Sequence, residues 1–156
     1  GLVKTTSPTF DTNYLTIPGI GAASAYADLD AFGTIFEIPH LPKRGIFLSA
    51  RMLDLDDEGA VGVIDLHLFR NPFVPTADNS ALALSDADVR YGYECSVSIN
   101  VTYDSNTSFF IVKDALNIQF WAPRGKLYAQ AQVRGVANIA AGSEPLIRLM
   151  GLVLEP

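Results

Sequence analysis

The acidic stretch that begins at Asp54 comes nearest to a metal site in residue type and spacing. Asp54, Asp56 and Glu58 stand at alternate positions, Gly59 follows, and Asp65 is the twelfth residue. A calcium loop of the EF-hand type needs oxygen ligands at positions 1, 3 and 5, a glycine at 6 and a bidentate glutamate at 12. Here the twelfth residue is an aspartate, and both flanks alternate with the period of a strand. We therefore expect an exposed, charged hairpin turn and no bound metal.

The other groups that could support catalysis lack the partners that their chemistry needs. His40 and His67 are the two histidines, too few for a catalytic zinc site built from three histidines, and we expect His67 on a strand surface. No serine lies in the G-x-S-x-G turn of a hydrolase. Residues 19–21 lack the further glycine and the lysine of a phosphate-binding loop. Cys95 is the single cysteine, and its alternating surroundings favour a buried, structural thiol. We predict no enzymatic activity, no catalytic residue and no cofactor.

The aromatic residues leave a second function open. Exposed aromatic rings can form a platform that stacks against sugars, although scattered aromatics in a β-rich chain are more often part of the core. Together with exposed acids, such a platform would suit a carbohydrate-binding module. The residues that could supply it are Tyr91, Tyr93, Tyr103, Phe109, Phe110, Phe120, Trp121 and Tyr128.

The composition favours association with other proteins. Only 18% of the 156 residues are charged and 49% are hydrophobic, whereas soluble domains typically have about 25% charged residues. A domain with so few charges must expose apolar patches, and large patches usually mark interfaces. The net charge of -6 disfavours nucleic acid and anionic membranes, which are bound by clustered lysine and arginine. We therefore expect protein partners, including further copies of the chain, and neither nucleic acid nor membrane.

From residue 34 onward the apolar residues mostly recur with period two, which predicts an all-β domain. Turn residues separate the alternating runs, as in the hairpin whose turn is Pro123 to Gly125. About eight strands of this kind predict a two-sheet β-sandwich or jelly roll. The expected strands cover residues 34–38, 46–55, 61–69, 94–102, 108–112, 117–121, 126–134 and 146–154.

Two further elements complete the expected organisation. Prolines and glycines interrupt residues 1–33, where no period is sustained, so we expect an extended N-terminal arm preceding a sandwich domain of residues 34–156. Residues 14–17 could form one short strand in this arm. Ser85 lies three residues before Asp88, a variant of the helix capping box. This spacing predicts one short helical turn that ends near Tyr91.

One stretch of the chain resembles a small group of tailed-bacteriophage and prophage head proteins. An Asp-Leu-x-Leu-Phe pattern ends the strand at residues 65–69, a Thr-Ala-Asp-Asn element follows at 76–79, and a Ser-Asp-Ala-Asp turn lies at 85–88. The resemblance extends more faintly from about residue 34 to the strand around Ile147 to Leu149, and does not include the arm.

Proteins of this group look like capsid decoration, or cement, proteins. The resemblance implies a structural virion protein that sits as a homotrimer on the outer surface of the capsid and clamps adjacent major capsid protein subunits. We expect the arm and the loop from Arg70 to Ala83 to make these contacts. A carbohydrate-binding or receptor-binding virion protein is the alternative, and a hydrolase or metalloenzyme is a third hypothesis. Interfaces draw their energy from a few buried apolar anchors, for which the candidates are Phe69, Pro72, Phe73, Tyr14 and Ile17.

Overall fold

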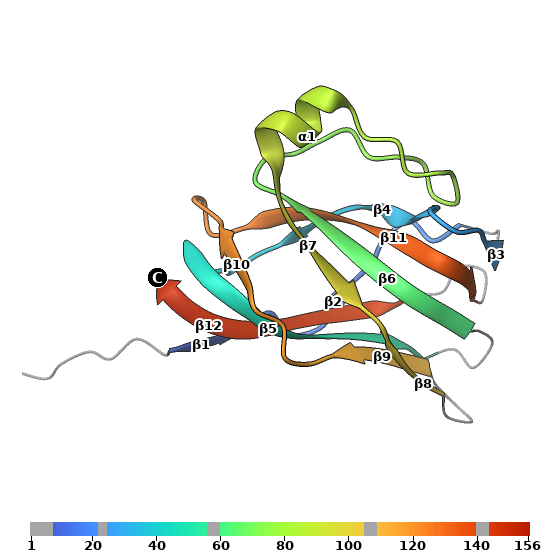
Figure 1. Ribbon diagram of the computed structural model, residues 1–156. Helices are drawn as coiled ribbons and strands as arrows, with labels where there is room; N and C mark the ends of the chain where they lie inside the picture. Colours follow the sequence, from blue (N-terminus) through green and yellow to red (C-terminus); the bar gives the residue numbers. More distant parts are fainter. Residues whose placement is uncertain (1–7, 22–24, 56–59, 105–108, 140–143) are drawn as a thin grey trace, which may run out of the picture.

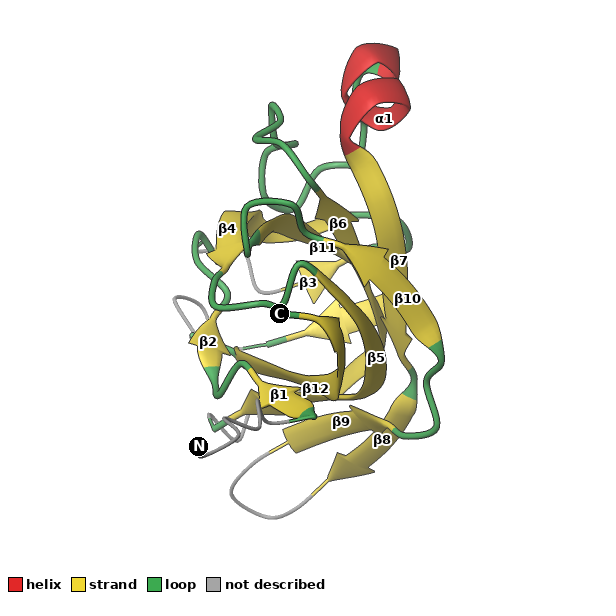
Figure 2. Ribbon diagram, turned by 90° about the vertical axis from the view of Figure 1, so that its left-hand side faces the viewer, coloured by secondary structure: helices red, strands yellow, loops and turns green. Residues whose placement is uncertain are grey.

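The computed structural model describes residues 8–21, 25–55, 60–104, 109–139 and 144–156, and these form a β-sandwich of two antiparallel sheets (Figures 1 and 2). The first sheet has the order β1-β12-β5-β9-β8, with β2 also paired to β12 and β10 to β5. The second has the order β3-β11-β6-β7, with β4 also paired to β11. The predicted all-β sandwich is therefore confirmed. No helix in these ranges is long and apolar enough to cross a membrane.

The two sheets differ in strand length and number. The strands of the first sheet are β1 (Thr9–Asp11), β2 (Leu15–Thr16), β5 (Arg44–Asp54), β8 (Val101–Asp104), β9 (Phe109–Lys113), β10 (Ile118–Trp121) and β12 (Leu146–Glu155). Those of the second sheet are β3 (Ala25–Tyr26), β4 (Ala31–Ile38), β6 (Ala60–Phe69), β7 (Tyr93–Ile99) and β11 (Leu127–Asn138). The described residues thus contain more strands than the eight expected. The run at 94–102 divides at Asn100 into β7 and β8, which belong to different sheets.

The core lies between the sheets and follows from the alternation of the long strands. In β11, Leu127, Ala129, Ala131 and Val133 are fully buried on the inner face. The opposite face of β11 departs from expectation, because Gln130 is also fully buried. A half-exposed strand was predicted here. Alternation shows which side chains share a face, but it does not show that another segment of the chain covers this outer face.

The N-terminal segment contributes to the same core. Strand β1 pairs with β12 and brings Phe10 against Phe47 and Phe120, with ring centroids 5.9 and 5.6 Å away. Further along, Ile17 and Tyr26 are only 1% and 2% exposed. The predicted arm is therefore extended, but it packs against the sandwich wherever it is described. We call its described part, residues 8–21 and 25–33, the N-terminal strap.

The strap joins the two sheets along one side of the sandwich. Ile17 N donates to Pro145 O at 2.8 Å, next to the first sheet, and Thr34 N in β4 of the second sheet donates to Pro18 O at 2.9 Å. At Gly33, φ is +75°, and a Cβ atom would lie 2.5 Å from Pro18 O. Only glycine allows this approach without strain. The boundary expected after residue 33 falls inside β4, so strap and sandwich form one folded unit.

The burial of Ile17 gives a direct test of the strap. Replacing it with alanine should lower the free energy of unfolding by about 2–4 kcal/mol, because a large side chain leaves the core and a cavity remains. Thr16→Ala, at the exposed neighbouring position, is the control and should change stability by less than about 0.5 kcal/mol. Urea unfolding measures both. Equal stability of the two variants would show that the segment is a free arm.

Candidate functional site

A lobe of residues 70–92 projects from the outer face of the second sheet (Figure 1). The chain leaves β6 at Phe69, forms a long loop, continues as α1 (Asp86–Gly92) and returns in β7. Ser85 is the N-cap of α1 and its hydroxyl accepts a hydrogen bond from Asp88 N at 3.1 Å, as the capping spacing predicts. The lobe contains the Thr-Ala-Asp-Asn and Ser-Asp-Ala-Asp elements of the phage resemblance.

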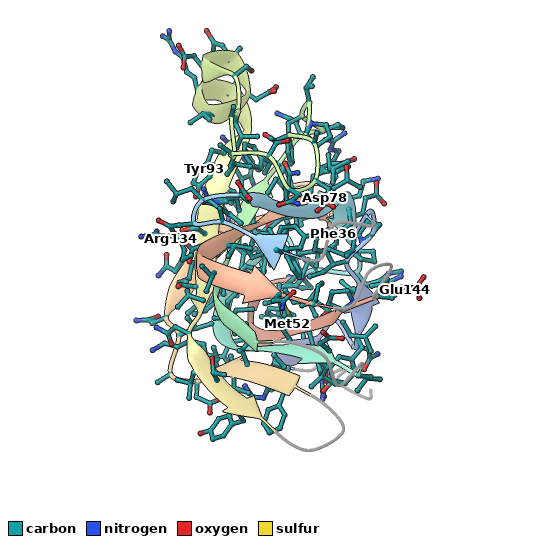
Figure 3. The ribbon with its side chains drawn as sticks, turned by 90° about the vertical axis from the view of Figure 1, so that its right-hand side faces the viewer. Phe36, Met52, Asp78, Tyr93, Arg134 and Glu144 are labelled. Atoms are coloured by element: carbon teal, nitrogen blue, oxygen red, sulfur yellow. The ribbon has the colours of Figure 1, made fainter. Side chains whose placement is uncertain are left out.

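Asp78 fixes the lobe to the strap and to β4. Its Oδ1 accepts hydrogen bonds from Gly33 N at 2.8 Å and from the Tyr26 hydroxyl at 2.9 Å, and its Oδ2 accepts from Gly21 N at 2.8 Å. Figure 3 shows Asp78 on the side of the second sheet away from Met52, which lies in the core. Burial, together with the hydrogen bond and the negative charge of Asp78, raises the pKa of Tyr26 above its ordinary value.

Gln130 is a second attachment point, directly beneath the lobe. Its Oε1 accepts from Thr76 N at 3.0 Å, and its Nε2 donates to Thr76 O at 2.7 Å and to Gly33 O at 3.2 Å. The Thr76 hydroxyl in turn pairs with both backbone groups of Ala83. These contacts explain why Gln130 is buried on a face predicted to be exposed. They also give the Thr-Ala-Asp-Asn element a structural role.

Backbone hydrogen bonds extend this attachment along the loop. Asn79 N donates to Ala31 O at 2.9 Å, Ala31 N donates to Ser80 O at 2.8 Å, and Leu82 N donates to Leu29 O at 3.0 Å. Asn79 has a φ of 61°, a left-handed conformation that asparagine adopts more readily than most residues. The lobe is thus held in one conformation by side chains and by backbone.

A small second core lies beneath the lobe and contains two of the predicted interface anchors. Phe69, Phe73 and Tyr128 are buried there, with the rings of Phe69 and Phe73 4.1 Å apart. Phe69 and Phe73 were predicted as surface anchors, as was Ile17, and the structure places all three inside the chain. The alternating pattern could not show that the lobe folds back over Phe69.

The other predicted anchors and several lobe residues are exposed. Tyr14 lies beneath the guanidinium of Arg148, 5.5 Å from it, and remains 42% exposed. Pro72 is exposed on the lobe, and its role as a contact stays a prediction. Nearby, Val74 is 76% exposed and Tyr91 is 66% exposed. We call Pro72, Val74, Val89 and Tyr91 the apolar lobe surface. The sequence predicted Pro72 as an anchor, Val74 within the contact loop and Tyr91 as a possible sugar-stacking residue, and it did not single out Val89.

The residues considered for metal binding are separated. Asp54 is buried at the end of β5, which contradicts its expected place at an exposed turn, and residues 56–59 lie outside the described residues. Asp65 forms an ion pair with Arg134 at 3.1 Å. Within the described ranges, no group of three histidine, cysteine, aspartate or glutamate side chains could hold a metal.

The histidines and the cysteine are accounted for by structural contacts. His40 is exposed between β4 and β5. His67 Nε2 lies 2.8 Å from Gln132 Oε1 and its Nδ1 lies 3.0 Å from the Tyr93 hydroxyl. Because an amide oxygen only accepts, His67 Nε2 donates to Gln132. Burial raises the pKa of Cys95 to about 12, so its thiol stays protonated and unreactive.

The described aromatic residues of the predicted set do not all lie on one exposed platform. Among the described members of the predicted set, Tyr91, Tyr103 and Trp121 are exposed, and they belong to α1, β8 and β10. Phe120 and Tyr128 are buried. The pocket beside α1 has a volume of about 50 Å³, far below the roughly 300 Å³ or more of small-molecule sites. An open pocket of about 300 Å³ lies away from the lobe, between β1, β5 and β12. The lobe therefore has the properties of a contact surface.

Comparison with models of protein families, with curated protein sequences and with solved structures finds no match.

The attachment by Asp78 can be tested by mutation. Asp78→Ala leaves the amides of Gly21 and Gly33 and the Tyr26 hydroxyl without their acceptor, and should cost about 3 kcal/mol of unfolding free energy. Asp86→Ala, in the exposed first turn of α1, is the control and should cost less than about 1 kcal/mol. Chemical denaturation measures both. A loss for Asp78→Ala no larger than for the control would contradict the attachment.

The raised pKa of Tyr26 predicts a loss of stability at alkaline pH. Above pH 10, the ordinary value for tyrosine, the unfolded chain releases this proton while the folded chain keeps it, so rising pH favours unfolding. The loss should reach up to about 1.4 kcal/mol per pH unit for this group. Tyr26→Phe should be less stable near neutral pH but lose less between about pH 10 and 11. Parallel pH profiles for both proteins would exclude this role of Tyr26.

Proposed function

We propose that the chain is a structural virion protein that decorates and stabilises a bacteriophage capsid. In this role it sits as a homotrimer on the outer surface and clamps adjacent major capsid protein subunits. One observation carries the proposal. The segment that resembles phage head proteins forms a firmly attached lobe that carries exposed apolar side chains, with Val74 and Tyr91 largely exposed.

The rigidity of the lobe supports a clamping function. A loop that is already ordered loses little conformational entropy when it binds, so more of its contact energy appears as affinity. Asp78 and Gln130 provide this order before any partner is present. Since three linked copies bind with a high effective local concentration, a modest contact from each lobe is sufficient for tight binding of the trimer to the capsid.

The apolar surface supports the choice of a protein partner. Exposed apolar residues on one projecting lobe gain free energy when another surface covers them, at roughly 25 cal/mol per Å² of apolar area. Aromatic residues such as Tyr91 are enriched among the residues that dominate binding. Other apolar side chains, including Leu55 and Leu154, are also more than half exposed, which fits a chain that associates.

A double substitution on the lobe and a control substitution outside it test the lobe as a contact surface. Val74→Asp combined with Tyr91→Asp should abolish co-sedimentation with heads of the encoding phage that lack this protein, because charge on an apolar contact stays unpaired. Val136→Asp is the control, since Val136 is 72% exposed against 76% for Val74 and lies in β11, outside the lobe. The control should co-sediment like the wild type. All variants should keep the wild-type circular dichroism spectrum.

The oligomeric state, the presence of the chain in virions and its binding to glycans also test the proposal. Light scattering should give a trimer, and an antibody against the chain should detect it in purified virions at a copy number comparable to the coat protein. A monomer that is absent from virions would exclude the capsid role. A glycan array should be silent, and a specific signal there would favour the carbohydrate-binding or receptor-binding alternative.

A further inference from the structure

Trp121 and three arginines form an exposed cluster at one end of the sandwich. Trp121 ends β10 and stands opposite Arg44 of β5 in the sheet register. The guanidinium groups of Arg44 and Arg70 each lie over the Trp121 ring, 5.3 Å from its centroid. Arg124 belongs to the turn between β10 and β11. We call Arg44, Arg70, Trp121 and Arg124 the Trp121 platform.

The platform is held in place from below by Glu94. One carboxylate oxygen of Glu94 accepts a hydrogen bond from Trp121 N at 3.0 Å, and the other lies 3.6 Å from Arg70 Nε. The Glu94 side chain is only 15% exposed, so it supports the platform and is not part of its outer surface. An ordered arginine is better prepared to bind than one that moves freely in water.

The platform is continuous with the lobe. Arg124 Nη2 donates to Arg70 O at 3.0 Å and to Asn71 Oδ1 at 3.3 Å, and Asn71 Nδ2 donates to Tyr91 O at 3.4 Å. Tyr91 is part of the apolar lobe surface. Arginine, tryptophan and tyrosine are the residue types most enriched at the energetic centres of interfaces. Here they occur together at one end of the chain.

The charge of the platform is opposite to that of the chain. The whole sequence has a net charge of -6, yet the platform brings three guanidinium groups together. Glu94 and Glu155 pair with Arg70 and Arg44, whereas no carboxylate within the described ranges forms an ion pair with Arg124. The platform therefore has positive charge available for a ligand.

We propose that the Trp121 platform binds an acidic segment of a partner polypeptide. Guanidinium groups hold carboxylates through paired, charge-assisted hydrogen bonds, and the neighbouring Tyr91 offers apolar area to the residues between the acids. Nucleic acid fits poorly, since binding to a phosphate backbone draws on many lysine and arginine contacts and the platform has three arginines. A neutral sugar fits poorly too, because it would have to displace an arginine from the ring. The inference goes beyond the capsid role and does not depend on it.

The probe is a fluorescein-labelled peptide in which glutamates alternate with leucines, compared with the same peptide carrying glutamines. The glutamate peptide should bind more tightly, and its affinity should fall as salt is raised. Arg44→Gln combined with Arg124→Gln should weaken binding about tenfold or more. Arg134→Gln is the matched control, because Arg134 and Arg44 are both 54% exposed and each pairs with one carboxylate. This control variant should bind the glutamate peptide like the wild type. The single variant Arg124→Gln repeats the test if the double variant is unstable.

Four results would overturn the proposal. The first two are equal affinity for both peptides and an equal loss of peptide affinity in Arg134→Gln. The others are binding of a sialylated oligosaccharide at these arginines without binding of the peptide, and a change of oligomeric state in the platform variants without a change in peptide affinity. The last result would make the platform a contact between copies of the chain. Absence of the chain from virions, by contrast, would remove the capsid role and leave the platform's ligand unaffected.

Discussion

The Asp78 carboxylate connects the lobe to the strap and the start of β4, which lie at least 45 residues earlier in the chain. It accepts hydrogen bonds from Gly21 and Tyr26 in the strap and from Gly33 in β4, while belonging itself to the lobe. Without this acceptor, several donors beneath the lobe would have no partner and the lobe would lose its attachment to the strap. The exposed apolar lobe surface depends on this attachment, because a loop of such composition would otherwise turn its apolar residues inward.

The features that obey a local rule could be predicted from the sequence. Period-two alternation identified the long strands, since a strand places successive side chains on opposite faces. The capping pair of Ser85 and Asp88 identified α1, because the contact is made within one turn. The two-sheet architecture followed from the number of strands. The predicted hairpin across Pro123 to Gly125 was wrong, because β10 and β11 belong to different sheets and the turn between them crosses from one sheet to the other.

The features that depend on distant segments could not be predicted in this way. Ile17 is buried because the strap crosses between the sheets, and Phe69 is buried because the lobe folds back over β6 and β11. The strap contributes single residues to the core at irregular intervals, so no period identifies it. The Trp121 platform was missed because Arg44, Arg70 and Arg124 are far apart in the chain and meet only through strand pairing and the turn after β10.

The strap and the lobe share their hydrogen bonds, so they should open and close as one cooperative unit. A partner that covers the lobe stabilises every segment that must be folded for the lobe to exist. Binding at this surface should therefore slow amide hydrogen exchange at Gly21 and Gly33 as well, although neither belongs to the lobe. The N-terminal segment would then report occupancy of a surface formed by the middle of the chain.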